Sequence, residues 1–202
     1  MRSAEFTATT DGVLLVPVSG GTGSGELQRV RLLARAIHAR WPDLAIAIAA
    51  EQHALSGSHD DGVDRVPLPH SPTRCSSEVI TAIHARRPRL VVFDSTARPQ
   101  QLRAAREVGA QVIYISSRPS ARARGFRWGA FGCIDEHWSV ELDLDAKLPN
   151  LWQRWLLRQR PALRWRPLST LNEPADASLW STDIRDFVAA GPYVLFCAGG
   201  GG

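Results

Sequence analysis

The chain has 202 residues, of which 44% are hydrophobic and 22% are charged, and its formal net charge is +4. These values are ordinary for a folded protein, and the length allows one large domain or one domain with part of a second. The longest apolar runs are far shorter than the roughly 20 residues of a membrane-spanning helix, and the N-terminus has no apolar signal core. The three cysteines lie far apart without ligand spacing, which argues against a disulfide framework or a zinc site and predicts a reducing, cytoplasmic compartment.

The positive charge is concentrated in two stretches of the chain. Arginine accounts for 23 of the 24 basic residues. Six basic residues and no acid lie between Lys147 and Arg166, and four basic residues and no acid lie between Arg118 and Arg127. Such patches favour anionic partners, such as nucleotide phosphates or lipid head groups. Motifs typical of nucleic-acid-binding domains are absent, so we expect no nucleic-acid partner.

The first two thirds of the chain alternate between short apolar runs and amphipathic segments. Strands are expected at Gly12–Val18, Leu44–Ala50, Val63–Leu68, Leu90–Phe93, Gln111–Ile115 and Cys133–Val140. Helices are expected at Leu27–Ala39, Ser76–Arg86 and Gln100–Val108, with a polar loop at Gln52–Asp64. This alternation predicts an α/β fold, a doubly wound, Rossmann-like and mostly parallel sheet with helices on both faces.

The pattern changes after Val140. A basic, tryptophan-bearing helix is expected at Leu148–Arg160, an irregular Pro-rich connection at Pro161–Ala177, a short helix at Asp183–Ala189 and a strand at Tyr193–Ala198. We therefore expect a Rossmann-like domain over residues 1–145 and the basic helix with its irregular connection over 146–190. Residues 191–202 are expected to form the first strand and glycine loop of a second domain that is cut off.

The basic helix carries an apolar stripe. Trp152, Trp155 and Leu156 lie at positions i, i+3 and i+4, a spacing that is typical of a helix face buried in a core. Arg154, Arg158 and Arg160 flank this stripe, and basic residues beside tryptophan also suit an anionic bilayer surface. The core interpretation is the more common one for such a stripe.

The glycine-rich segment GGTGSGE follows the first strand and matches neither of two common phosphate-binding motifs. Gly20 and Gly25 have the spacing of a P-loop, but Glu26-Leu27 replaces its Lys-Ser/Thr, so a phosphate would be repelled. Gly21 and Gly23 fit the start of a dinucleotide-binding motif, but Glu26 takes the place of the third glycine. The sequence therefore argues against nucleotide hydrolysis of the P-loop type and gives little support to NAD(P) binding.

The strand, the GGTGSGE loop and the helix containing LLARAI (Leu32–Ile37) together resemble the N-terminal domain of GT-B glycosyltransferases. The resemblance is to the group that includes the peptidoglycan lipid II synthase and to the related nucleotide-sugar hydrolases, and it extends to the strand-end Asp94. It implies an acceptor-side domain of an enzyme that transfers a sugar from a nucleotide-sugar, most simply a UDP-sugar, to an acceptor that can be lipid-linked. It also implies that a C-terminal domain or subunit supplies most of the donor contacts. We expect no cofactor, and a lipid-linked acceptor would make a peripheral contact of the basic helix with the inner face of the membrane useful. The loop residues implied to bind substrate are Gly21, Thr22, Gly23, Ser24 and Gly25.

Glu26 departs from the family pattern, which places a histidine after the last glycine. A carboxylate can take a proton from an acceptor hydroxyl, so the resemblance implies that Glu26 is the catalytic base. The alternative is structural, because an acid in the first turn of a helix interacts favourably with the helix dipole. This departure weakens the hydrolase interpretation more than it weakens the glycosyltransferase interpretation. A non-enzymatic or split-partner Rossmann-like domain also stays open as an alternative.

Polar side chains at other strand ends are further candidates. Asp94 follows a buried strand and is the second catalytic candidate, with a cap or Asx-turn as the alternative. Ser116, Ser117 and Arg118 follow the next strand, and His137 lies in or near the sixth strand, as candidates for binding sugar hydroxyls or phosphate. The remaining histidines show no metal-ligand spacing, so we expect no metal site.

Overall fold

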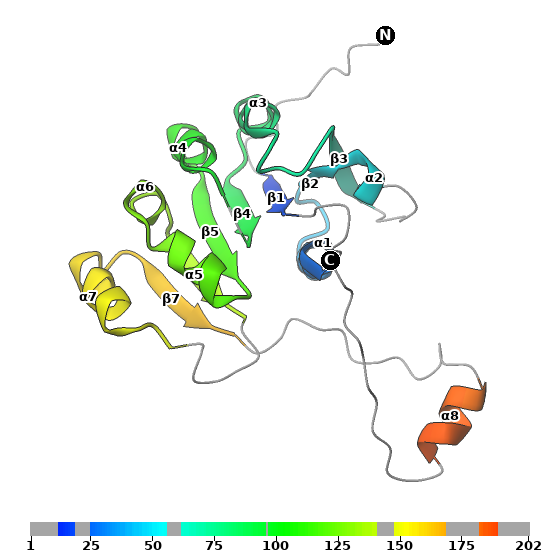
Figure 1. Ribbon diagram of the computed structural model, residues 1–202. Helices are drawn as coiled ribbons and strands as arrows, with labels where there is room; N and C mark the ends of the chain where they lie inside the picture. The colour runs from blue at the N-terminus through cyan, green and yellow to red at the C-terminus, as the bar shows by residue number, and fades with distance from the viewer. Residues whose placement is uncertain are drawn as a thin grey trace.

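A parallel β-sheet forms the centre of the computed structural model, which describes residues 12–18, 25–55, 62–95, 97–140, 148–168 and 182–189 (Figure 1). The strands are β1 (Val13–Pro17), β2 (Ile46–Glu51), β3 (Val63–Leu68), β4 (Leu90–Asp94), β5 (Gln111–Ser116), β6 (Glu136–Ser139) and β7 (Arg164–Pro167). Within these ranges the sheet has seven strands in the order β3-β2-β1-β4-β5-β6-β7, and each neighbouring pair is parallel. The predicted doubly wound α/β sheet is confirmed, and its described part is wholly parallel.

Helices connect the strands and cover both faces of the sheet. They are α1 (Gly25–Arg40), α2 (Gln52–Leu55), α3 (Ser76–Arg86), α4 (Pro99–Glu107), α5 (Pro119–Gly125), α6 (Trp128–Phe131) and α7 (Leu151–Gln159), whereas α8 (Thr182–Ala189) follows the last strand. The sequence predicted α1, α3, α4, α7 and α8, with some differences at their ends. It missed three short helices, because α2 lies in the expected polar loop and α5 and α6 lie in the arginine-rich connection.

Two apolar clusters, one on each face, hold the helices to the sheet. On one face Leu27 and Val30 of α1 pack with Leu15 of β1. On the other face Val79 of α3 and Leu102 of α4 lie in the cluster that contains alternate residues of β1 and β4. Figure 1 shows α1 on the opposite side of the sheet from α3 and α4. The central strand β1 is buried throughout, as expected for a parallel strand that is covered on both faces.

The connections reverse direction between β1 and β4. From β1 the chain first builds outward through β2 and β3, and it then returns to add β4, β5, β6 and β7 on the other side. In open α/β sheets the crevice at the carboxyl ends of the strands beside such a reversal is where ligands bind. The fold therefore directs attention to the carboxyl ends of β1 and β4.

The last strand of the sheet was not predicted. The connection expected to be irregular over Pro161–Ala177 contains β7, which pairs with β6. Arg166 Nε donates to Glu136 Oε2 at 2.7 Å, and Arg164 Nε lies 3.5 Å from Glu136 Oε1 across the same strand pair. These cross-strand ion pairs and a proline at its end suit an edge strand. The expected strand at Tyr193–Ala198 lies outside the described residues.

The expectation that the tryptophan stripe of α7 is core was wrong for the two tryptophans. Gln153 and Leu156 are the buried residues of α7, whereas Trp152 and Trp155 are 56% and 45% exposed. The two indoles stack on each other with centroids 4.7 Å apart. Among the described residues, the buried part of α7 is one narrow line, and the rest of its apolar stripe is exposed. In the described part of the chain, no helix combines the length and the apolar character needed to cross a membrane.

Candidate functional site

Asp94 lies at the carboxyl end of β4, beside the reversal point of the sheet. Its Cα is opposite Pro17 of β1 and Ile115 of β5. Side chains alternate between faces along a strand. Phe93 belongs to the cluster on the α3–α4 side and Val92 to the cluster on the α1 side, so Asp94 points toward α1.

The carboxyl group of Asp94 is buried and ion-paired. Arg29 Nε of α1 donates to Asp94 Oδ2 at 2.7 Å, and the Asp94 side chain is 0% exposed. Burial raises the pKa of Asp94 to about 6, although the neighbouring Arg29 lowers it, and the nearby Glu26 carboxyl adds to the rise. A carboxyl group with a pKa this close to neutrality can gain or lose a proton during catalysis.

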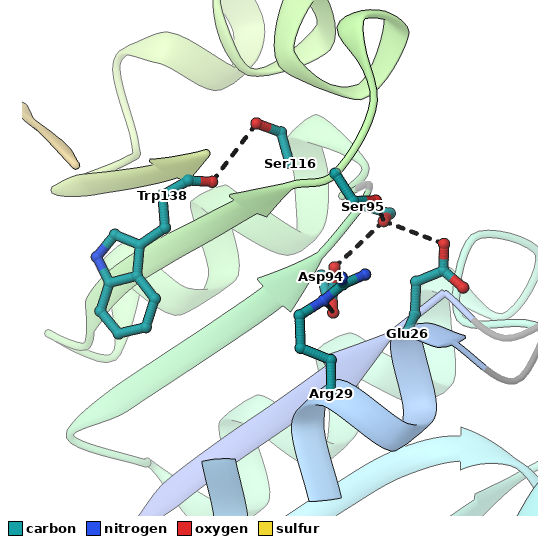
Figure 2. Close-up of polar contacts among 7 residues, drawn as sticks. Glu26, Arg29, Asp94, Ser95, Ser116 and Trp138 are labelled. Atoms are coloured by element: carbon teal, nitrogen blue, oxygen red, sulfur yellow. Dashed lines mark hydrogen bonds and ion pairs between the residues drawn. The ribbon is translucent and has the colours of Figure 1, made fainter. Parts of the chain in front are cut away.

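A serine hydroxyl joins Asp94 to Glu26 in the first turn of α1. Ser95 Oγ lies 3.2 Å from Asp94 Oδ1 and 3.2 Å from Glu26 Oε1, and it can donate its proton to either carboxyl group. Ser117 Oγ lies 3.3 Å from the same hydroxyl. Figure 2 shows Glu26, Arg29, Asp94 and Ser95 converging from α1 and the end of β4. The two predicted catalytic carboxyl groups are thus brought together, and Glu26 is the partly exposed one.

The backbone of Ser95 is held in an uncommon conformation. Its φ angle of +71° lies in the left-handed region, which costs a residue with a side chain about 1–2 kcal/mol. Three contacts fix it: its N–H donates to Ile115 O at 2.9 Å, and its carbonyl accepts from Tyr114 Oη at 3.1 Å and from Arg124 Nη1 at 3.5 Å. Strained residues of this kind persist where the surroundings over-determine them, and they cluster at functional sites.

Ser116 and His137 lie on the opposite face of the sheet from Asp94. Both are 0% exposed, and His137 Nε2 lies 3.0 Å from Ser116 Oγ, which in turn donates to Trp138 O at 3.4 Å. Figure 2 shows Ser116 directed toward the Trp138 carbonyl and away from the carboxyl pair. Because alternate residues of β5 face opposite sides, Ser117 reaches the Ser95 hydroxyl and Ser116 does not. The substrate-binding role expected of Ser116 and His137 stays a prediction, and their burial restricts it to an indirect one.

His137 is packed among aromatic rings. The rings of Tyr114, Phe126 and Trp165 lie around it at centroid distances of 4.7–5.2 Å. Burial, followed by the nearby Arg122, lowers the pKa of His137 to about 3. The ring is therefore neutral. Nδ1 has no hydrogen-bond partner among the described residues, so the tautomer that leaves Nδ1 as an acceptor and donates from Nε2 to Ser116 is the less costly one.

The remaining sequence candidates are placed as follows. Gly21, Thr22, Gly23 and Ser24 lie outside the described residues. Gly25 is the exposed first residue of α1, and a Cβ there would meet no atom within 4 Å among the described residues. Arg118 is exposed and precedes α5 as its N-cap residue. In the described ranges, no group of three or more His, Cys, Asp or Glu side chains could hold a metal ion.

Sequence reasoning missed two members of the site, Arg29 and Ser95, and it gave Ser117 only as a candidate for binding substrate. Arg29 follows Glu26 by three residues, which places both on one helix face, and this spacing was the available signal. Ser95 and Ser117 each directly follow a strand-end candidate. Their proximity depends on the β4–β5 register, in which Asp94 is opposite Ile115.

A cleft of about 610 Å³ adjoins this site. Its walls come from Val18 after β1, from residues 97–99 at the start of α4, and from the α5–α6 region, with Thr73 at one side. A volume of this size is typical of small-molecule sites. Arg124, which donates to the Ser95 carbonyl, lines the cleft and connects it with the carboxyl pair.

Comparison with known proteins supports the fold. The structure of Arabidopsis thaliana UGT89C1 complexed with UDP is similar to this chain, with a TM-score of 0.53 and 11% sequence identity. The similarity covers 89% of this chain and 56% of the UGT89C1 chain, so this chain spans little more than half of that protein. No protein-family model and no curated protein matches the sequence. The chain thus has the Rossmann-like fold of a GT-B domain.

Proposed function

We propose that this chain is the acceptor-side part of a GT-B glycosyltransferase, which transfers a sugar from a nucleotide-sugar to an acceptor hydroxyl. The observation that carries the proposal is the pair of carboxyl groups, Glu26 and Asp94, joined by the Ser95 hydroxyl at the reversal point of the sheet. An inverting transfer needs a base beside the acceptor hydroxyl. Glu26 occupies the position that holds a histidine in the resembling family.

The geometry suggests a separate role for each of the two carboxyl groups. Glu26 is partly exposed and takes the proton from the acceptor hydroxyl as the hydroxyl oxygen attacks the anomeric carbon. The bond from that carbon to the nucleoside diphosphate breaks, and the diphosphate leaves with the electron pair. Ser95 can then accept a proton from Glu26 and pass its own to Asp94, with Ser95 Oγ 3.2 Å from each carboxyl group. Asp94 is buried and does not touch the acceptor, so it is a positioning and proton-holding residue. Arg29 fixes its orientation.

The donor is proposed to be a UDP-sugar held mainly by a second domain or subunit. Support comes from the fold, since the similar UGT89C1 structure contains UDP and is nearly twice as long as the region that it shares with this chain. The GGTGSGE loop resembles that of the lipid II synthase group, and from this resemblance we further propose that the acceptor is lipid-linked.

A peripheral membrane contact belongs with a lipid-linked acceptor. The outward face of α7 carries Leu151, Trp152 and Trp155, which are 83%, 56% and 45% exposed, and Arg154 and Arg158 are exposed beside them. Interfacial segments combine indole rings with arginines that attract anionic head groups. We propose that this face rests on the inner surface of the membrane.

The test of the proposed function is sugar transfer by Glu26→Gln in the protein joined with its donor-binding domain. We expect turnover to fall by about 10²–10⁴ with the fold retained, because glutamine cannot accept the proton. Glu78→Gln is the matched control, since Glu78 is an exposed acid in the first turn of α3, away from the site. Equal turnover of the two variants would reduce Glu26 to a helix-dipole residue, whereas no sugar transfer by the unchanged protein would favour a non-enzymatic binding role.

A further inference from the structure

The cleft beside the carboxyl pair is strongly basic. Three of the residues that line it are arginines, Arg98, Arg124 and Arg127, and no acid is among its described lining residues. All three arginines are exposed, so their guanidinium groups are accessible from the cleft. Like charges gathered in one concave site repel each other, and an anionic ligand relieves this repulsion.

The arginines are placed by contacts with backbone carbonyls. Arg98 Nε donates to Thr73 O at 3.1 Å, and Arg124 Nη1 donates to Ser95 O at 3.5 Å. Both acceptors are backbone carbonyl groups, and these contacts orient the two side chains. Guanidinium groups bind phosphate and carboxylate oxygens with paired, charge-assisted hydrogen bonds.

The start of α4 forms one wall of the cleft. Arg98 and Pro99 line it, and Gln101 fixes this turn by accepting from Arg98 N at 2.9 Å and donating to Pro72 O at 2.7 Å. The N-terminus of a helix carries a partial positive charge, which adds to that of the arginines. Gly129 forms the facing wall, where a Cβ would approach Pro99 to 3.3 Å. The glycine therefore allows the two walls to stand close together.

We propose that this cleft binds an oxyanion, a phosphate or carboxylate, carried by the sugar acceptor. The inference deepens the proposed function and rests on it. Ser95 connects the two halves of the site, because its carbonyl accepts from Arg124 while its hydroxyl contacts Glu26. An acceptor anchored by its anion in the cleft therefore has its neighbouring hydroxyl groups near the Glu26 carboxylate. The acceptor class is an anionic sugar.

The test is calorimetric titration of the full chain with glucose 6-phosphate, glucuronate, glucose and UDP. We expect the two anionic sugars to bind at least about tenfold more tightly than glucose and than UDP, with an affinity that falls as salt rises. Glucose 6-phosphate carries a phosphate and glucuronate carries a carboxylate, so comparing their affinities shows which of the two anions the cleft prefers. Glucose binding as tightly as both anionic sugars, or UDP binding more tightly than both, would overturn the proposal.

Variants of the arginines locate the binding. Arg127→Gln and Arg98→Gln should each weaken binding of the preferred anionic sugar about tenfold or more, since each removes charge-assisted hydrogen bonds. Arg103→Gln is the control, because Arg103 is an exposed arginine of α4 that does not line the cleft, and it should leave the affinity within about twofold. An equal loss in all three variants would overturn the cleft assignment in favour of a general charge effect.

Glu26→Gln separates this proposal from the proposed function. The variant should bind the anionic sugar at least as tightly as the unchanged chain, because Glu26 contributes no attraction to an anion. Unaltered turnover with intact anion binding would refute the catalytic role alone. Lost turnover in a chain that binds no anion would refute the cleft proposal alone.

Discussion

Asp94 is a carboxyl group whose burial and ion pair act in opposite directions on its ionisation. Arg29 lies 2.7 Å away, yet burial dominates and raises the pKa of Asp94 from 3.8 to about 6. The unfolded chain therefore releases this proton at lower pH than the folded chain. As pH rises through this window, the ionising carboxyl group lowers the stability of the folded protein.

Asp94→Asn should remove this pH dependence. We expect its free energy of unfolding, relative to that of the unchanged chain, to rise by about 1 kcal/mol between pH 5 and pH 7. Urea unfolding of both proteins at the two pH values measures the difference. A relative free energy that is flat or falls with pH would show that the Arg29 ion pair outweighs burial.

His137 should produce the opposite slope. Its pKa is lowered from 6.5 to about 3, so the unfolded chain takes up a proton that the folded chain does not, and stability falls as pH drops below 6.5. His137→Gln keeps a hydrogen-bonding group near Ser116 but does not titrate. Its stability relative to the unchanged chain should rise by about 2 kcal/mol from pH 7 to pH 5. The same urea titrations check this, and a relative stability that does not change with pH would contradict the burial of a neutral ring.

At the scale of the elements, the sequence predicted what depends on local pattern. The apolar runs of β1, β2, β4 and β5 and the helical periodicity of α1, α3 and α4 are local, and all were found close to their expected positions. The strand β7 is only four residues long, and its strand character depends on Glu136 and on the aromatic cluster around Trp165. Such long-range pairing leaves no signal in the segment itself.

The same distinction between local and long-range signals applies to the candidate site. The placement of Glu26 and Asp94 at the carboxyl edge of the sheet followed from strand ends and from the family resemblance, whereas the Ser95 hydroxyl that joins them was not predicted. Neither the strand ends nor the resemblance indicated that Ser116 lies apart from Asp94, because this depends on the face of the sheet toward which each side chain points. A shift of one residue places Ser117, and not Ser116, beside Ser95.

A further prediction concerns the outward face of α7. The double substitution Trp152→Ser and Trp155→Ser should weaken binding of the chain to vesicles containing anionic lipid by about tenfold or more. The reason is that the two exposed indole rings, which would enter the lipid interface, are then absent. Flotation with anionic and with neutral vesicles measures this. Trp41→Ser is the control, since Trp41 is 55% exposed and follows α1 at the other edge of the sheet. Equal flotation of all variants would refute the membrane contact.

At the scale of the molecule, we propose that the chain supplies one side of a two-sided cleft. In the proposed arrangement the nucleotide contacts come from a second domain, so the 202-residue chain by itself should bind UDP only weakly, with a Kd above about 1 mM. Calorimetry with UDP and UDP-sugars measures this. Micromolar binding together with sugar transfer by the purified chain would show that it carries its own donor site.

The central claim is that Glu26, Ser95 and Asp94 act as one unit in removing the acceptor proton. The most direct test is a double-mutant cycle on sugar transfer, in the protein joined with the proposed donor-binding domain. The cycle compares Glu26→Gln, Ser95→Ala and the double variant. If Ser95 acts through Glu26, the double variant should be no more than about threefold slower than Glu26→Gln alone, since residues of one catalytic unit have non-additive effects. Effects of the two substitutions that multiply would show that Glu26 and Ser95 work independently and would contradict the account.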